Sequence, residues 1–467
     1  MNATWLLLTL ALAVTLQAQP WQAQELPDPA GMHVDDWFFV DANGDGRKDV
    51  LWIDLRAGTV ALQLAPFDAP AQPTKLPPGV RAFQFAEICA PDGEDLLLLH
   101  QRGVSILPGC TGSPLPWLET PLAFAGTLKD GFACLGFGRD VDGDGHEDLM
   151  FPTRAGEMLL HRKPDGAPGV LERVGPQPSI EHARGGGGLF FERLSFPRVE
   201  LVATGKNKKP MALLLDRQGL SELTADGSAL RTVFAFPGTP SKTFGQLERV
   251  ECTIEDLEGT GVDAVLVART RVEEARLPEP RTEIVLYRQG SSEPVGVLLL
   301  NGLLSTGPEL VDLNGDGQKD MLLAVVPSGV TGELQKLVGR LPITWHVWFH
   351  GPSTMPFARS PDFSWTDTLD AASLERWGLR HRLLVGPDVN GDGLLDLVSV
   401  SRDGEDWLAT TWFQSREGER RFHRSTESQT VLKGRVHSMS TLRTSGSRAL
   451  VFRKPNALVL LTHQGAR

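Results

Sequence analysis

The stretch Asp140-Val-Asp-Gly-Asp-Gly-His-Glu-Asp148 decides the fold, because three close copies of it recur along the chain. In chain order we call them the first (Asp41–Asp49), second (Asp140–Asp148), third (Asp312–Asp320) and fourth (Asp388–Asp396) aspartate loops. Each reads D-x-[DN]-G-D-G-x-x-D and continues into an apolar run typical of a β-strand. The glycines at loop positions 4 and 6 allow the positive φ that a tight loop requires. Such self-similarity is typical of a repeat protein.

The side chains of the aspartate loops form a set of hard oxygen ligands. Carboxylates or amides stand at loop positions 1, 3, 5 and 9, and position 7 can add its backbone carbonyl. Each loop carries at least three aspartates, which would repel one another without a cation. The pattern therefore predicts about four Ca²⁺ sites, one in each loop.

Strand-like runs follow each loop in pairs, and similar pairs recur where the loop pattern is lost. The chain holds eight such pairs, for example Asp49–Ile53 followed by Thr59–Leu64. Each pair is preceded by another strand, and a looser fourth usually follows. A repeated four-stranded unit predicts an all-β fold, a β-propeller with eight blades and seven as the alternative. A spare strand near Gln24–Leu26 would pair with the last strand, near His463, and close the ring.

At these residues the chain resembles the FG-GAP/VCBS repeat family, whose calcium-loop blades also occur in integrin alpha-subunit propellers. The resemblance covers essentially everything after the N-terminal apolar segment. It implies that calcium is held by four side chains in each loop and by the carbonyl at position 7. The implied side-chain ligands are Asp41, Asn43, Asp45, Asp49, Asp140, Asp142, Asp144, Asp148, Asp312, Asn314, Asp316, Asp320, Asp388, Asn390, Asp392 and Asp396, and the carbonyls are those of Arg47, His146, Gln318 and Leu394.

Four further units depart from the loop pattern. In the stretch 256–264, Thr260 replaces the aspartate of position 5 and Ala264 that of position 9. We expect this loop to keep its fold without the metal, although its remaining acidic residues leave a weak site open. The loop 87–95 and the loops before Glu200 and Ala449 have lost the pattern. The topology of a blade would place all these loops on one rim of the propeller.

The N-terminus and the composition indicate an exported globular protein. Residues 1–18 are a short apolar run that fits a secretory signal peptide, with a retained anchor as the alternative. Residues 19–467 are expected to form one propeller domain, secreted or placed in the periplasm or at the cell surface. The net charge of −12 argues against nucleic acid as a partner. No other segment is apolar and long enough to cross a membrane.

Two smaller features concern cysteine and tryptophan. Cys89 and Cys110 fall in two loops at the same end of one predicted blade, which makes a disulfide between them possible. Six of the eleven tryptophans lie between residues 345 and 412. Trp365 lies just before a predicted short helix, 367–377, and Trp377 is the last residue of that helix. Both tryptophans are candidates for a ligand-binding surface.

The sequence favours a binding function over a catalytic one. It has no H-E-x-x-H, G-x-S-x-G or Walker A motif, and no catalytic constellation can be assigned. We expect a non-catalytic calcium-binding module for adhesion or assembly, with a protein or glycan ligand on the rim. The alternative is a carbohydrate-active enzyme resembling the polysaccharide lyases built on calcium-loop propellers, or a lectin.

Overall fold

The computed structural model describes residues 21–463, and the strands account for nearly all of its regular structure. The described range has gaps at 90–92, 123–132, 135–137, 142–143, 145, 163–166, 178, 185–189, 196–197, 206–208, 216–218, 225–228, 236–247, 272–280, 289–292, 327–339, 352–354, 371–382, 387, 390–391, 404–405, 416–421, 434–435, 437 and 445–446. The predicted signal peptide, residues 1–18, lies outside it. Among the described residues, no helix has the length and apolarity needed to span a membrane.

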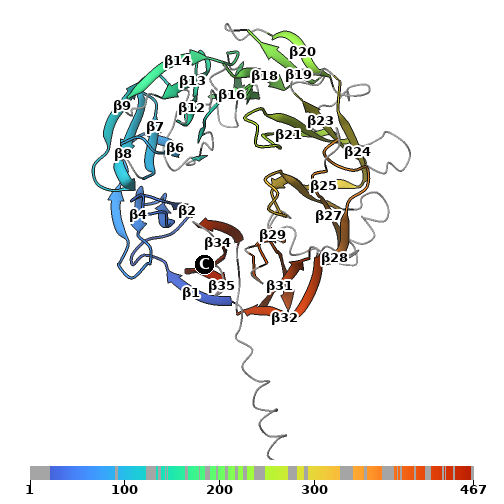
Figure 1. Cartoon of the computed structure of the whole chain (residues 1–467). Coiled ribbons are helices and arrows are strands. Elements are labelled where there is room, and N and C mark those ends of the chain that lie inside the picture. The colour runs from blue at the N-terminus through green and yellow to red at the C-terminus, as the bar shows by residue number, and fades with distance from the viewer. Residues whose placement is uncertain are drawn as a thin grey trace, which may run out of the picture. The chain divides into compact units, whose positions relative to one another are not determined.

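Eight blades, each of four antiparallel strands, form a β-propeller, as the sequence predicts (Figure 1). The chain divides into two compact units, residues 28–374 and residues 1–27 together with 375–467. The larger unit holds six blades, each built from strands that follow one another along the chain. Blade 1 consists of β2 (Asp36–Val40), β3 (Asp49–Asp54), β4 (Thr59–Gln63) and β5 (Gln72–Lys75), and blade 2 consists of β6 (Val80–Ala86), β7 (Asp95–His100), β8 (Gly103–Leu107) and β9 (Leu115–Glu119). Blade 3 consists of β11 (Gly138–Arg139), β12 (Asp148–Thr153), β13 (Gly156–Arg162) and β14 (Pro168–Arg173), and blade 4 consists of β17 (Val199–Val202), β18 (Met211–Leu215), β19 (Gly219–Leu223) and β20 (Ala229–Ala235). Blade 5 consists of β21 (Glu248–Glu255), β22 (Ala264–Arg271), β23 (Arg281–Arg288) and β24 (Gly296–Asn301), and blade 6 consists of β25 (Leu303–Val311), β26 (Asp320–Val326), β27 (Arg340–Trp348) and β28 (Phe363–Asp370).

The smaller unit holds the last two blades. Blade 7 is β29 (Leu383–Val385), β30 (Leu397–Asp403), β31 (Asp406–Gln414) and β32 (Phe422–Leu432). Blade 8 is β33 (Ser438–Thr444), β34 (Ser447–Lys454) and β35 (Ala457–His463), completed by β1 (Trp21–Pro27) from the start of the chain. β1 pairs with β35 along its whole length, from Trp21 opposite His463 to Pro27 opposite Ala457. The predicted pairing of the two ends of the chain is confirmed.

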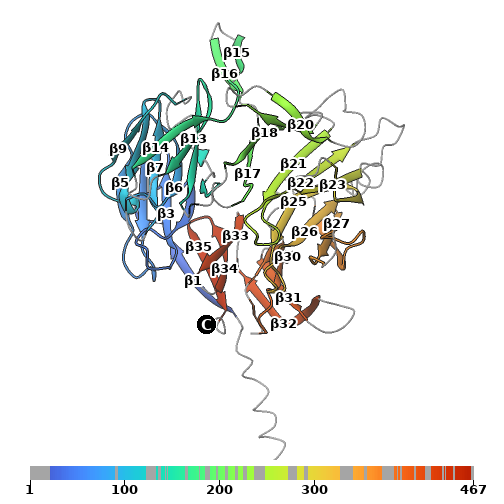
Figure 2. The same ribbon diagram turned by 45° about the horizontal axis from the view of Figure 1, so that its top comes forward.

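Three small elements lie outside the regular blades. The two-residue strand β10 (Ala133–Cys134) pairs in parallel with β6, and the 3-10 turn η1 (Pro108–Cys110) follows β8. Between blades 3 and 4, β15 (Ser179–Arg184) and β16 (Phe190–Ser195) form a separate hairpin, which Figure 2 shows projecting away from β13 and β18. The glycine run 185–188 connects these two strands and lies outside the described residues.

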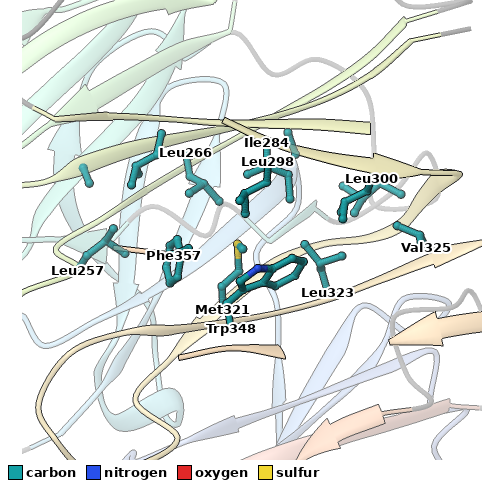
Figure 3. Packing of buried hydrophobic residues seen from close by; sticks show 14 residues of the cluster. Leu257, Leu266, Ile284, Leu298, Leu300, Met321, Leu323, Val325, Trp348 and Phe357 are labelled. Carbon is teal, nitrogen blue, oxygen red and sulfur yellow. The ribbon is translucent and has the colours of Figure 1, made fainter. Parts of the chain in front are cut away.

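The apolar core is divided into clusters that neighbouring blades share. The second strands β3 and β26 are buried along their whole length, because each is covered on both faces. This explains why they read as continuous apolar runs rather than as alternating ones. Figure 3 shows the cluster between blades 5 and 6, where Leu266 and Ile284 of blade 5 face Met321 and Trp348 of blade 6. Each blade thus depends on its neighbour for burial.

Candidate metal centre

The four aspartate loops occupy the same place in four blades. Each connects the first strand of its blade to the second, and its ninth residue begins or immediately precedes that second strand. The first and third loops are described in full, whereas Asp142 and Asn390 lie outside the described residues. Positive φ angles occur at Gly44 (69°) and Gly46 (78°), and at the equivalent Gly315 (74°) and Gly317 (84°). The glycines therefore serve the conformational purpose that the sequence predicts.

A shared set of hydrogen bonds folds these loops. The backbone N–H of position 6 donates to the Oδ2 of position 1, at 3.0 Å for Gly46 to Asp41 and 2.9 Å for Gly317 to Asp312. The backbone N–H of position 7 donates to the Oδ1 of position 5, at 2.8 Å in the first, second and third loops and 2.9 Å in the fourth. These side-chain acceptors hold the turn together in the way of Asx turns.

The incomplete loop 256–264 folds in the same manner. The N–H of Gly261 donates to Asp256 Oδ2 at 2.6 Å, and the N–H of Val262 donates to the hydroxyl of Thr260 at 3.3 Å. Thr260 thus accepts the hydrogen bond that the aspartate at position 5 accepts in the other loops, but it offers no carboxylate. The loop keeps its fold with a poorer set of anionic ligands, as the sequence predicts.

The aspartate at position 9 is buried and anchors the loop to its blade. Asp320 accepts hydrogen bonds from the N–H groups of Leu313 and His350, both at 2.8 Å. Asp49 and Asp396 accept equivalent pairs of bonds, from the N–H of position 2 and from an N–H at or just after the end of the third strand. A carboxylate has about four lone-pair sites, so two such bonds leave capacity for a cation.

Burial opposes the negative charge of these anchoring aspartates. Loss of hydration raises the pKa of Asp320 to about 6 and that of Asp396 to about 7, while their backbone hydrogen bonds act in the opposite direction. The carboxylates at positions 1 and 5 of the same loops raise both pKa values further. A positive charge in the loop would favour the ionised form of all these groups.

The donor set of the loops fits a calcium ion, although their carboxylates bond to the backbone. Across the described part of the chain, no three His, Cys, Asp or Glu side chains converge as metal ligands. In the first loop, however, Asp41 Oδ1 is buried and has no hydrogen-bond partner. A buried carboxylate oxygen without a partner is costly, and a cation would satisfy it. Oxygen donors alone are also what Ca²⁺ prefers.

Sequence reasoning missed that the position-9 anchor persists where the metal pattern is lost. Asp95 begins β7 in the stretch 87–95, and it is fully buried. Its carboxylate accepts hydrogen bonds from the N–H groups of Ile88 (2.9 Å), Cys89 (2.5 Å) and Gly109 (2.8 Å). An aspartate at the start of an apolar strand was the available signal. The anchoring role therefore does not depend on the metal pattern.

The predicted disulfide is not formed in the structure. Cys89 is an exposed free thiol and Cys110 a buried one. Cys110 Sγ lies 3.5 Å from the carbonyl oxygen of Glu94, its hydrogen-bond acceptor. The two cysteines belong to two loops of one blade, as expected, but Cys110 is buried in the apolar cluster between blades 1 and 2.

Of the two candidate tryptophans, Trp365 packs against its own blade. Its ring stacks on Trp345, with 6.2 Å between centroids and 20° between planes, and it also contacts Phe363 at 5.3 Å. Trp365 is partly buried, so the exposed ring expected at this position is not found. The predicted helix at 367–377 is wrong at its start, because β28 continues to Asp370. Trp377 lies outside the described residues.

A cavity of about 690 Å³ lies between blades 3 and 4. Leu159 and Val174 of blade 3 and Ala212 and Leu223 of blade 4 contribute to its apolar lining. An ion pair between Lys209 and Glu172 joins the two blades at this cavity. Both charges of this pair are thereby compensated within the protein.

Comparisons with known proteins find structural likeness only. No protein-family model matches the chain, and no curated protein sequence matches it. The WD40 domain of SCAP from fission yeast is 11% identical, with 96% of this chain and 99% of that chain covered and a TM-score of 0.43. The β-propeller domain of Nup133 from Vanderwaltozyma polyspora is 8% identical, with the same coverage and a TM-score of 0.40. A lectin from Agrocybe aegerita that recognises non-reducing terminal N-acetylglucosamine is 14% identical, with 73% and 87% covered and a TM-score of 0.40. The assignment of the fold rests on the strand pairing described above.

Proposed function

We propose that this protein is a calcium-binding β-propeller of the FG-GAP/VCBS type, exported from the cell, that acts as a non-catalytic binding or assembly module. The observation that carries the proposal is the recurrence of one turn. Four loops with oxygen donors at the same positions stand between the first and second strands of four blades, and their described residues share the same kinds of hydrogen bond. Repeated hard-oxygen loops of this kind suit Ca²⁺.

In each loop the aspartates of positions 1, 5 and 9, the side chain of position 3 and the carbonyl of position 7 would hold the ion. Calcium would supply the positive charge that these crowded carboxylates lack. The loop joins two strands of one blade, so holding its ligands together stabilises that blade. Five protein ligands against the usual six to eight leave room for water or for a group from a partner.

Calcium binding is tested by thermal unfolding in millimolar Ca²⁺ and in chelator. We expect a higher melting temperature in Ca²⁺, because a ligand that binds only the native state stabilises it by about 2.7 kcal/mol per site at one hundred times its Kd. Identical melting curves in the two conditions would contradict the proposal. Equilibrium dialysis measures the stoichiometry, which should be about four.

A matched pair of variants tests whether the aspartate loops are the sites. Asp316→Ala and Thr260→Ala both remove the side chain at position 5, in loops that share one fold. We expect Asp316→Ala to lose one bound Ca²⁺ and part of the thermal gain, whereas Thr260→Ala keeps all the bound calcium. Equal stoichiometry in both variants would show that the third loop is not a site.

The binding role and the export are tested separately. Glycan and protein arrays, probed in Ca²⁺ and in chelator, should give calcium-dependent ligands, and incubation with polysaccharides should give no unsaturated uronic products. A calcium-dependent rise in their ultraviolet absorbance would replace the binding module with a lyase. The intact mass of exported protein should correspond to a chain that lacks residues 1–18.

A further inference from the structure

Glu94 of blade 2 binds the first aspartate loop of blade 1 through hydrogen bonds. The N–H of Asp41 donates to Glu94 Oε2 at 2.6 Å, and the N–H of Glu94 donates back to the carbonyl oxygen of Asp41 at 2.7 Å. The ammonium group of Lys48, at position 8 of the first loop, also bonds to Glu94 Oε2. One carboxylate from the next blade thus contacts the residue that begins the loop and a residue near its end.

The same two-way contact recurs between blades 4 and 5. The N–H of Ala203 donates to Asp263 Oδ2 at 2.6 Å, and the N–H of Asp263 donates to the carbonyl oxygen of Ala203 at 3.2 Å. Asp41 and Ala203 both follow the first strand of their blade directly. Glu94 and Asp263 both stand at position 8 of their own loops. The loop that begins at Ala203 lacks the aspartate pattern, so its contact with Asp263 has a purely structural role.

Gly93, the residue before Glu94, also lies close to the backbone of the first loop. A Cβ atom at Gly93 would lie 2.7 Å from the carbonyl oxygen of Ala42 and 3.2 Å from the backbone nitrogen of Gly44. Such a contact is too short, so position 93 requires glycine. The buried Oδ1 of Asp41, which has no hydrogen-bond partner, belongs to the residue that Glu94 holds by its backbone.

We propose that Glu94 is a positioning residue for a cation in the first loop, and that binding there is coupled to the docking of blade 2 on blade 1. The proposal rests on the calcium function proposed above. Glu94 holds Asp41 where the loop begins, which lowers the conformational entropy that ion binding must remove. It also pairs with the ammonium group of Lys48, whose charge would otherwise repel a dication.

The experiment isolates the first loop and compares two isosteric variants. The background chain carries Asp144→Ala, Asp316→Ala and Asp392→Ala, which disable the other three loops. Titration calorimetry with Ca²⁺ alone should detect one site in this background. Glu94→Gln should weaken its affinity at least about fivefold, which is the lower end of typical coupling between sites. Asp263→Asn breaks the matching contact of blade 5 and should change the affinity less than about twofold.

A second measurement separates positioning from stability. Because coupling is reciprocal, Glu94→Gln should lower the melting temperature more in Ca²⁺ than in chelator, whereas Asp263→Asn should lower it equally in both. Gly93→Ala, which changes no charge, should also weaken Ca²⁺ binding by displacing the backbone of the first loop.

The outcomes distinguish this proposal from the one on which it rests. If the background chain binds no Ca²⁺, the first loop is not a calcium site and both proposals fail there. If it binds one Ca²⁺ and Glu94→Gln binds it equally well, the calcium site stands and the positioning role is wrong. Equal losses of affinity in Glu94→Gln and Asp263→Asn would also overturn the positioning role.

Discussion

At the scale of single residues, the aspartate at loop position 9 has an anchoring duty in the structure, beside the metal-binding duty that we propose for it. The spacing predicts a metal ligand, while the structure adds a buried carboxylate that accepts backbone hydrogen bonds from two loops of its blade. Asp95 separates the two duties, because it keeps the anchor in a loop without the metal pattern. Hydrogen bonds to a charged acceptor contribute about 1.5–3 kcal/mol each.

Replacing Asp95 should therefore destabilise the protein whether or not calcium is present. Asp95→Asn puts an amide donor where only acceptors are needed, and we expect the free energy of unfolding to fall by about 2–4 kcal/mol. Urea unfolding in Ca²⁺ and in chelator measures this loss, which should be equal in the two conditions. A loss confined to the calcium condition would instead mark Asp95 as a metal ligand.

Glu157 on β13 is a buried carboxyl group whose burial makes stability depend on pH. Its Oε2 has no hydrogen-bond partner, and loss of hydration, with a smaller contribution from the charge of Glu200, raises its pKa from 4.5 to about 7. The folded state then holds a proton that the unfolded state releases between these values. The free energy of unfolding should fall as the pH rises from about 4.5 to about 7, by up to about 3 kcal/mol.

The variant Glu157→Gln should remove the contribution of Glu157 to this pH dependence. At pH 8 we expect the variant to be more stable than the original chain, and near pH 4 the two should differ little, because Glu157 is then protonated in both states. Urea unfolding across this pH range measures the difference. A variant that is less stable at pH 8 would show that the carboxylate makes a favourable contact.

At the scale of elements, the pairing of β1 with β35 joins the two ends of the chain in one blade. The sequence locates this strand only weakly, because Gln22, Gln24 and Glu25 are polar and the whole range Gln22–Glu25 is exposed. Trp21 and Leu26 are buried, and Trp21 packs in a cluster with residues of blades 7 and 8. The buried side chains of Trp21 and Leu26 thus hold this mostly polar strand against its blade.

Trp21→Ala should therefore destabilise the smaller unit strongly. Removing a buried tryptophan leaves a cavity and costs about 3–5 kcal/mol, whereas Gln22→Ala, at an exposed position of the same strand, should cost less than about 0.5 kcal/mol. Urea unfolding compares the two variants. Equal effects would mean that β1 is held by its backbone hydrogen bonds alone.

At the scale of the whole molecule, the apolar clusters between blades differ in size. Among the described residues, the cluster between blades 3 and 4 has four buried members, whereas the one between blades 5 and 6 has fourteen. The cavity of about 690 Å³ lies at the junction of blades 3 and 4. Glu157 lies there too, with its Cβ 3.1 Å from the Cβ position that a side chain at Gly175 would take. Among the apolar clusters described between blades of residues 28–374, the one at this junction has the fewest buried members.

We expect blades 3 and 4 to open locally before blades 5 and 6. Local unfolding follows the density of apolar contacts, so amide protons of β12, β13 and β18 should exchange faster than those of β22, β23 and β26. Hydrogen exchange followed by mass spectrometry resolves these peptides. Equal protection of the two groups would show that the cavity does not weaken the junction.

Much of the fold could be predicted from the sequence because a propeller blade is a local unit. Its strands follow one another along the chain, and the loop Asp140–Asp148 with its copies indicates where the second strand begins in four of the eight blades. The eight blades and the pairing of the chain ends follow from that repeat. The hairpin of β15 and β16 was missed, because the glycine run between its strands predicts a turn without indicating what the turn connects.

The sequence by itself determined which oxygen donors each loop offers, because ligand spacing within nine residues is a local property. Only the tertiary structure decided what those loops contact. The hydrogen bond between Asp41 and Glu94 joins residues that are 53 positions apart in the sequence. The hydrogen bond between Ala203 and Asp263 joins residues that are 60 positions apart. The stacking of Trp365 on Trp345 and the enclosure of Cys110 depend in the same way on which strands lie side by side. Such contacts arise from strand pairing and blade packing, which bring together residues that no local pattern relates.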